Sequence, residues 1–324
     1  MLKFLFLYPL SLLFSLVVDL RNWLYDKRIL SIKKSNIPII SVGNLDVGGT
    51  GKTPFVIELC NVLKQQNLRP LIITRGYKRQ TKELIFINTN DDLQEHTAQN
   101  LGDEPYHIIK SIKDAFMIID HNKKRAVAFA NTLNNIDYII LDDGYQSRYI
   151  QKNIEIVLLN MSRPSNWYNM LPLGGLREPI KNLKRADFIY TVKGENNSRI
   201  KSKKLNTSFK IIEYKNGIKN NQVKIDANEK LISCCGIGDP QFFDDTLKKL
   251  NVRINKKIHF INHIKYNKDK LAQLEALLKN NDGLITTYKD FVKFNQQFLN
   301  KYLIYVVKMK IEIDDNKLIE KICL

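Results

Sequence analysis

The stretch SVGNLDVGGTGKTPF, residues 41–55, lies between an apolar run and a segment with helical spacing. The preceding residues IPII are typical of a buried strand, and TPFVIELCNVLKQQ (53–66) predicts a helix in which Pro54 fits the first turn. A glycine-rich loop between a strand and a helix holds phosphate groups, because its backbone N–H groups and the helix N-terminus point at the anion. The stretch therefore predicts a phosphate-binding loop.

This loop departs at one position from the strict P-loop pattern GxxxxGK[ST]. Gly51, Lys52 and Thr53 fit its second half, but Asp46 stands where the first glycine is expected. We expect Lys52 to reach the β- and γ-phosphates of a nucleotide and the Thr53 hydroxyl to bind Mg²⁺. The expected nucleotide-binding residues are Asn44, Gly48, Gly49, Thr50, Gly51, Lys52 and Thr53.

Strands and helices alternate on both sides of the loop. Apolar, β-branched runs predict strands at residues 37–44, 71–74, 84–88, 116–120, 137–143 and 154–160, with helices at 53–66, 104–112 and 123–135. Toward the C-terminus the alternation resumes, with a helix expected at 290–299. Buried strands that alternate with helices are typical of a mostly parallel sheet covered on both faces. The expected fold class is α/β: a P-loop NTPase-type sheet with helices on both faces, a second, smaller α/β domain and an N-terminal apolar helix.

The N-terminus carries an uncharged apolar run, FLFLYPLSLLFSLVV, at residues 4–18. This run is shorter than the roughly 20 residues that a membrane-spanning helix needs, and no small-residue cleavage site of a signal peptide follows it. Trp23 and Tyr25 come next among charged residues, as at a helix end on a membrane surface. The basic residues beyond them favour a cytoplasmic body. A helix packed on the domain is the alternative that the sequence leaves open.

A change in composition after about residue 195 divides the chain, because the next stretch is polar and rich in Asn and Lys. We expect four parts. They are an N-terminal membrane-surface helix (1–28), a P-loop domain (29–195), a β-type linker (196–228) and a smaller C-terminal α/β domain (229–324).

The composition of the 324 residues limits the class of protein. With 44% hydrophobic and 26% charged residues, the chain can bury a core, which argues against wholesale disorder. The net charge of +18 favours an anionic partner, although solvated surface lysine explains it equally well, and no nucleic-acid-binding motif accompanies the charge. The cysteines show no CxxC pair or metal-ligand spacing, which predicts reduced thiols in a cytoplasmic protein. They are Cys60, Cys234, Cys235 and Cys323.

Acidic residues at two places are candidates for metal binding or catalysis. The run DYIILDDG ends in Asp142 and Asp143 and resembles a Walker B strand, whose carboxylates meet the P-loop metal at the strand ends, although aspartates there also form simple turns. Asp103 and Glu104 stand just before a predicted helix, where they serve as a helix cap or as base and metal ligands. Arg177, in the loop PLGGLREP, is either a group that stabilises a transferring phosphoryl or an ordinary surface residue.

An ordered set of motifs adds a family resemblance. The segments SVGNLDVGGTGKTP, TRGYKR, GDEP, DDGYQSR, PLGGLREP, GIGDPQFFDDTL, FINHIKY and TYKDFVK follow one another along the chain. Together they resemble the tetraacyldisaccharide 4′-kinases of lipid A synthesis, whose P-loop also lacks the first glycine. The resemblance implies an ATP- and Mg²⁺-dependent phosphotransferase with an alcohol group as acceptor. The γ-phosphate would pass to the 4′-hydroxyl of a tetraacylated glucosamine disaccharide 1-phosphate.

The resemblance also implies a location and roles for individual residues. The enzyme would work at the cytoplasmic face of the bacterial inner membrane, with the lipid surface and not nucleic acid as its partner. A hydroxyl nucleophile benefits from a positioned proton acceptor, a role implied for Asp103 with His263 as its partner. The implied catalytic residues are Asp103, His263, Lys52 and Arg177, with Arg75 a weaker match, and the implied metal-side residues are Thr53, Glu104, Asp142 and Asp143. A base and a partner in different domains would make catalysis depend on domain closure.

Three residues depart from the family's usual motifs. Ser147 replaces a histidine, Asn262 replaces an aspartate before His263, and Tyr288 replaces a glutamate. These changes avoid the P-loop, the metal carboxylates and the implied base, and a slow enzyme or one of altered specificity is one outcome. From the residues alone, a membrane-associated P-loop ATPase or GTPase switch without a lipid acceptor remains the alternative.

Overall fold

The computed structural model describes residues 2–77, 79–91, 96–194, 200–226, 228–262 and 264–323. The chain forms two compact units. The first consists of Met1–Glu95, Ile108–Asn206 and Ile311–Leu324, and the second of His96–His107 and Thr207–Lys310. Residues 96–107 and 311–324 therefore group differently from the expected ranges. The expected boundaries at residues 28, 195 and 228 stay predictions.

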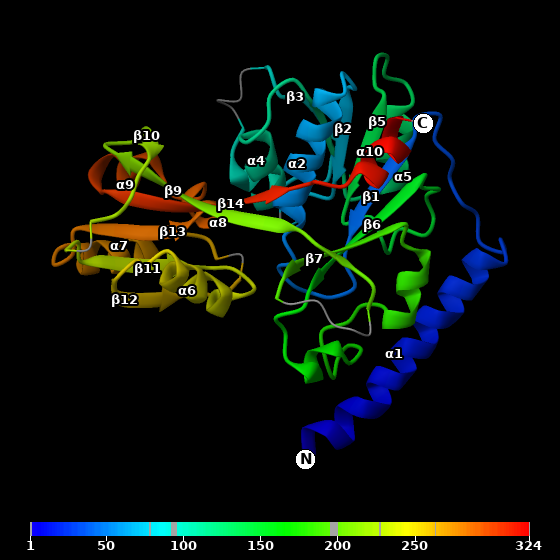
Figure 1. Cartoon of the computed structure of the whole chain (residues 1–324), viewed down its shortest axis with the longest axis horizontal. Helices are drawn as coiled ribbons and strands as arrows, with labels where there is room; N and C mark the ends of the chain where they lie inside the picture. The colour runs from blue at the N-terminus through cyan, green and yellow to red at the C-terminus, as the bar shows by residue number, and fades with distance from the viewer. Residues whose placement is uncertain are drawn as a thin grey trace. The chain divides into compact units, whose positions relative to one another are not determined.

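The first unit is built on an eight-stranded sheet (Figure 1). In spatial order its strands are β3 (Ile85–Asn88), β4 (Phe116–Ile119), β2 (Pro70–Thr74), β5 (Tyr138–Asp142), β1 (Ile39–Gly43), β6 (Ile154–Asn160), β7 (Phe188–Lys193) and β8 (Lys203–Lys204). Only β3, at one edge, runs antiparallel to its neighbour within the described part of this sheet. Every residue of β1, β2 and β6 is buried, which explains their unbroken apolar runs. The predicted mostly parallel α/β fold is confirmed.

Helices bury apolar faces against this sheet. Helix α2 (Lys52–Gln65) buries Phe55, Leu59 and Leu63. Helix α5 (Lys123–Ala130) places Ala126, Val127 and Ala130 in a cluster with sheet residues such as Ile39 and Leu71. Because β5 pairs in parallel with β1, the loop after β1 and the aspartates at the end of β5 lie at one edge of the sheet.

Short elements complete the first unit. They are the 3-10 helices η1 (Ser165–Tyr168) and η2 (Ile180–Arg185), and helix α10 (Asn316–Cys323), in which the carbonyl of Ile322 accepts a 2.7 Å hydrogen bond from the Tyr138 hydroxyl. Helices α3 (Ala98–Leu101) and α4 (Asp103–Ile109) lie between β3 and β4 in the sequence, but α3 and α4 as far as His107 belong to the second unit.

The second unit has a six-stranded sheet (Figure 1). Its order is β10 (Ile218–Gln222), β9 (Asn206–Lys215), β14 (Ile304–Glu312), β13 (Gly283–Thr287), β11 (Leu231–Cys235) and β12 (Ile254–His259). The helices are α6 (Pro240–Lys249), α7 (Lys268–Leu278), α8 (Tyr288–Phe291) and α9 (Gln296–Lys301). The single helix expected at 290–299 is wrong, because Asn295 accepts from the backbone N–H of Phe298 and so caps a separate α9.

The N-terminal helix α1 (Leu2–Asp26) is drawn in blue in Figure 1. It extends past the apolar run and includes Trp23 and Tyr25. Among the helices of the described residues, none combines the length and the apolarity that crossing a membrane requires.

Candidate active site

The glycine-rich loop joins β1 to α2, as the sequence predicts. Gly51, which caps α2, has a φ of 86°, and a Cβ there would lie 2.8 Å from Cγ1 of Val192. A Cβ at Gly49 would meet nothing within 4 Å, so the backbone is open at this point. The hydroxyl of Thr50 is buried without a hydrogen-bond partner among the described residues. An open backbone beside a helix N-terminus is suited to bind a phosphate group.

Asn44 connects the two ends of this loop. The ammonium of Lys52 donates to Oδ1 of Asn44 over 3.1 Å. The Asn44 amide donates to Asp46 over 2.8 Å, and Trp167 donates from Nε1 to the other Asp46 oxygen over 3.0 Å. Asp46, which stands in place of the first P-loop glycine, therefore orients the amide that receives Lys52.

Arg177 reaches the same point from the loop before η2. Its guanidinium binds Asp143 with two hydrogen bonds, 3.0 Å to Oδ2 and 2.8 Å to Oδ1, and it also donates to Oδ1 of Asn44. Lys52 lies 3.5 Å from Oδ1 of Asp143. The side chain of Arg177 is only 23% exposed, so it is not an ordinary surface arginine. Two cations and one carboxylate thus converge beside the phosphate-binding loop.

The charge of Asp143 follows from these neighbours. Burial by itself would raise the pKa of this carboxyl, but Lys52 and the Arg177 guanidinium outweigh burial and hold its pKa well below the usual value. Asp143 is therefore ionised at neutral pH. Its backbone has a φ of 48°, a left-handed conformation that is costly for a residue other than glycine.

Lys123, the first residue of α5, supports Asp142, the last residue of β5, and Asp143, which follows it. Its buried ammonium donates to the backbone carbonyls of Asp142, over 2.7 Å, and Asp143, over 2.6 Å. Burial lowers the pKa of Lys123 to about 8, although the two aspartates oppose the shift. The carboxylate of Asp142 is buried and accepts a 2.9 Å hydrogen bond from Thr74. Nothing in the sequence around Lys123 indicates this contact, because it depends on the tertiary fold.

Asp103 and Glu104 begin α4 and belong to the second unit. Lys293 lies 3.0 Å from Oδ2 of Asp103 and 3.7 Å from Asp290, and its side chain is 6% exposed. Lys289 lies 3.5 Å from Glu104. Each of these carboxylates therefore has a lysine beside it within its own unit.

The structure describes all three departures from the family motifs. His263 lies outside the described residues. Ser147 is buried, and so is Tyr288, whose ring contacts that of His107 with centroids 4.5 Å apart. The Lys308 ammonium lies 3.7 Å from the centre of the Tyr288 ring. Tyr288 is thus a packed side chain with a cation on its face.

The oxygen donors near the loop fit Mg²⁺. Thr53 is the second residue of α2, which follows β1, while Asp142 ends the paired strand β5 and Asp143 follows it, so a hydroxyl and two carboxylates come from the ends of neighbouring strands. In the described ranges, no group of three or more His, Cys, Asp or Glu side chains is arranged to hold a metal. Mg²⁺ is commonly held by one or two carboxylates together with substrate phosphates and water.

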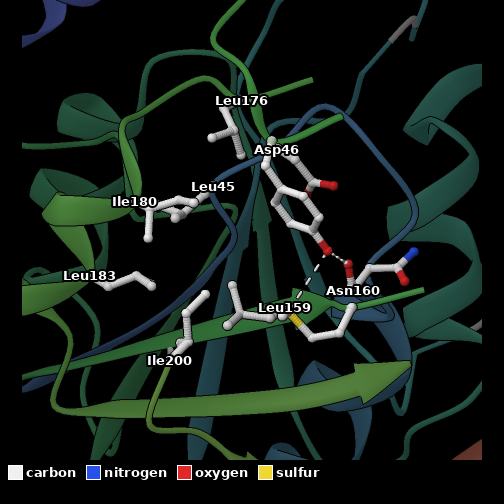
Figure 2. Close-up of a pocket in the computed structure, with 10 residues that line it drawn as sticks. Leu45, Asp46, Leu159, Asn160, Leu176, Ile180, Leu183 and Ile200 are labelled. Carbon is white, nitrogen blue, oxygen red and sulfur yellow. Dashed lines mark hydrogen bonds between the residues drawn. The ribbon is translucent and has the colours of Figure 1, made fainter. Parts of the chain in front are cut away.

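A small pocket lies beside the loop in the first unit (Figure 2). Its volume is about 20 Å³, room for about one water molecule. It is mostly apolar and is lined by Leu45, Asp46, Leu159, Asn160, Met161, Tyr168, Leu176, Ile180, Leu183 and Ile200. At this size it accommodates neither a nucleotide nor an acyl chain.

A phosphate-binding loop between β1 and α2, with its lysine beside an aspartate that follows β5, defines a P-loop phosphotransferase. The family model of tetraacyldisaccharide-1-P 4′-kinase matches residues 3–323. The chain is 34% identical to the tetraacyldisaccharide 4′-kinase of Psychromonas ingrahamii over 89% of this chain and 85% of the relative. It is 32% identical to that of Aquifex aeolicus over 98% of both chains. The chain belongs to the tetraacyldisaccharide-1-P 4′-kinase family.

A solved structure supports the fold of the whole chain. The crystal structure of the apo form of LpxK from Aquifex aeolicus, in complex with ATP, superposes with a TM-score of 0.79 at 28% identity. The match covers 100% of this chain and 99% of the other. The resemblance inferred from the motifs, and the kinase class that it implied, are thus confirmed.

Proposed function

We propose that this protein transfers the γ-phosphate of ATP to the 4′-hydroxyl of a tetraacyldisaccharide 1-phosphate. Membership of the family supports the substrate class, and the ATP complex of the related structure supports the donor. The observation that carries the proposal is the convergence of Lys52 and Arg177 on Asp143 beside the loop. Cations that are already fixed in this way are suited to stabilise charge on a transferring phosphoryl group.

The phosphate side of the site is assigned to the first unit. Gly48, Gly49, Thr50 and Gly51 would present backbone N–H groups to the phosphates, and Lys52 would reach the β- and γ-phosphates. Thr53, Asp142 and Asp143 would hold Mg²⁺, with Glu104 as a further candidate from the second unit. The metal supplies charge neutralisation on the phosphate oxygens. The guanidinium of Arg177, which binds Asp143, would also donate a hydrogen bond to the γ-phosphate.

The acceptor side of the site is assigned to the second unit. Asp103 would take the proton of the 4′-hydroxyl while the hydroxyl oxygen forms a bond to the γ-phosphorus. The bond between the γ-phosphorus and the β–γ bridging oxygen breaks at the same time, and ADP leaves. His263 would act as the partner of this base. Asp103 belongs to the second unit and Lys52 to the first.

The surface of α1 fits a lipid partner. The residues buried on this helix include Ser11, Val18 and Asn22, which follow one helical stripe. The rest of its surface exposes large apolar side chains, and they are Phe6, Tyr8, Leu10, Leu12, Leu13, Leu16, Val17, Leu20 and Trp23. This distribution is the reverse of that in an ordinary surface helix, and it suits insertion into a membrane interface. We place the enzyme at the cytoplasmic face of the inner membrane, where an acylated substrate resides.

A phosphoryl-transfer assay tests the function. Purified protein is incubated with γ-labelled ATP, Mg²⁺ and tetraacyldisaccharide 1-phosphate in detergent micelles, beside Lys52→Ala as the inactive control. We expect label in the lipid with the wild type and none with the control. ATP hydrolysis without labelled lipid would instead identify a P-loop ATPase switch.

The same assay tests the base. Asp103→Ala should lower kcat by about a hundredfold or more, the range of general base catalysis, with little change in the affinity for ATP. A variant that keeps the turnover of the wild type would remove Asp103 from this role.

A further inference from the structure

The buried face of α1 makes polar contacts with the loop that carries Arg177. Ser11 donates to the carbonyl of Met170 over 2.8 Å. About three turns further along the helix, Asn22 donates to Oε2 of Glu178 over 3.2 Å, and Arg21 lies 3.3 Å from Oε1. A membrane anchor that only tethers the protein would not need such directed contacts.

Glu178 is the centre of these contacts and is fully buried. Besides the two residues of α1, it accepts hydrogen bonds from Asn182, over 3.0 Å, and Arg185, over 2.7 Å. A buried carboxylate is stable only when its oxygens are fully paired. Two of these four partners come from α1, so the position of this carboxylate depends on the helix.

Two arginines connect Glu178 to the phosphate side of the site: Arg177, its neighbour in the sequence, and Arg185, its hydrogen-bond partner. Arg177, one residue before Glu178, holds Asp143 with two hydrogen bonds. Arg185 lies over the ring of Tyr145, with 4.3 Å from the guanidinium carbon to the ring centre. Tyr145 lies two residues after Asp143, and a Cβ added to Gly43, at the end of β1, would lie 2.5 Å from the Cβ of Tyr145.

We propose that α1 is a structural part of the phosphoryl-transfer site, and that Glu178 is a positioning residue through which the helix fixes Arg177. The inference rests on the phosphate-side role of Arg177 in the proposed function. When α1 is seated, Glu178 is held from both sides and the adjacent guanidinium is aimed at Asp143 and the loop. When α1 no longer packs against this loop, Glu178 loses two of its partners and the guanidinium of Arg177 is no longer held in one orientation.

The test separates the contact of α1 with Glu178 from the binding of α1 to membranes. Asn22→Ala removes one contact to Glu178 without leaving a buried charge unpaired, and Glu178→Gln weakens the centre itself. The matched control is Lys181→Ala, which breaks an exposed ion pair between the same loop region and Asp19 of α1, 2.7 Å long, and leaves Glu178 untouched. Each variant is assayed for kcat and KM in micelles, for thermal unfolding and for binding to lipid vesicles.

We expect kcat of Asn22→Ala and Glu178→Gln to fall by about tenfold or more, because small misplacements of a charged group are costly in the transition state. Their KM for ATP and the vesicle binding of Asn22→Ala should change by less than about threefold, and Lys181→Ala should match the wild type. Normal kcat in Asn22→Ala and Glu178→Gln, or a loss explained by unfolding alone, would overturn the proposal.

A second measurement tests the path through Arg177. In an Arg177→Ala background, Asn22→Ala should lower kcat no further, because residues that act as a unit are not additive. Fully additive losses would show that α1 acts elsewhere. A wild type that transfers no phosphate to lipid would refute the proposed function, whereas an active wild type with an unaffected Asn22→Ala variant would refute only this inference.

Discussion

Asp143 shows how single residues set the chemistry of the site. The sequence pattern predicts its presence at the end of a strand, but its charge state depends on three cations from distant segments: Lys52, Arg177 and Lys123. Local patterns identify Lys52 and Thr53 because a P-loop is contiguous in sequence. Lys123 and Lys293 are missed because the contacts that make them important are formed only in the folded chain.

Lys123 offers a direct test of the support behind the aspartates. Lys123→Met removes the ammonium that binds the carbonyls of Asp142 and Asp143. We expect stability to fall by about 1–3 kcal/mol, the cost of unpaired buried acceptors, and kcat to fall by about tenfold, with KM for ATP less affected. Urea unfolding and steady-state kinetics measure both. Lys124→Met, next in the sequence and exposed, is the control; equal effects in the two variants would contradict the assignment.

His107 predicts how the stability of the second unit depends on pH. Burial, with the nearby charges of Lys308 and Lys289, lowers the pKa of His107 to about 3. In the unfolded chain, with a pKa near 6.5, this histidine binds a proton at a pH where the folded chain leaves it neutral. Its contribution to the free energy of unfolding is therefore complete above about pH 6.5 and is lost as the pH falls toward 3. At pH 5 the loss is at most about 2 kcal/mol.

The matched variant for this prediction is His107→Phe, which keeps a ring against Tyr288. Urea unfolding at pH 7 and pH 5 should show a smaller difference in the free energy of unfolding for the variant than for the wild type. The same pH dependence in both proteins would mean that His107 does not titrate as stated.

At the scale of elements, strands with continuous apolar runs are predicted well, whereas elements of mixed composition are missed or merged. The strands 71–74 and 154–160 agree with β2 and β6 within a residue, because strands buried on both faces leave continuous apolar runs. β7 (Phe188–Lys193) and α10 (Asn316–Cys323) are missed, and α8 and α9 are merged, since capping by Asn295 is a local contact that periodicity does not reveal.

The apolar face of α1 gives a prediction at this scale. Replacing both Leu16 and Leu20, which are 65% and 57% exposed, with Gln removes apolar area from the proposed membrane face. We expect vesicle binding to weaken by at least about tenfold, because each buried CH₂ contributes about 0.8 kcal/mol. Sedimentation with vesicles measures the change. Ile218→Gln, an equally exposed residue of the second unit, is the control, and unchanged binding of the double variant would exclude this face as the contact.

At the scale of the whole molecule, chain order and spatial grouping differ. The last residues, 311–324, complete the first unit, and residues 96–107 belong to the second. A sequence assigns domains by contiguous changes in composition, so it does not reveal that the chain leaves a unit and returns. For the proposed enzyme, this means that the base-bearing helix α4 starts in one unit and ends in the other.

The net charge of +18 gives the last prediction. A cationic protein is attracted to anionic lipid head groups, with about 1 kcal/mol per lysine or arginine near the surface, and this attraction acts together with the apolar face of α1. Binding to phosphatidylcholine vesicles should therefore strengthen when anionic phosphatidylglycerol is added. The gain should disappear between about 0.1 and about 1 M salt, where the Debye length shrinks from about 10 to about 3 Å. Binding to phosphatidylcholine alone should hardly change over the same range, because apolar insertion is not screened by salt. Binding that is equally tight to both vesicles at low salt would mean that the positive charge is solvated surface and that α1 alone holds the enzyme to its lipid substrate.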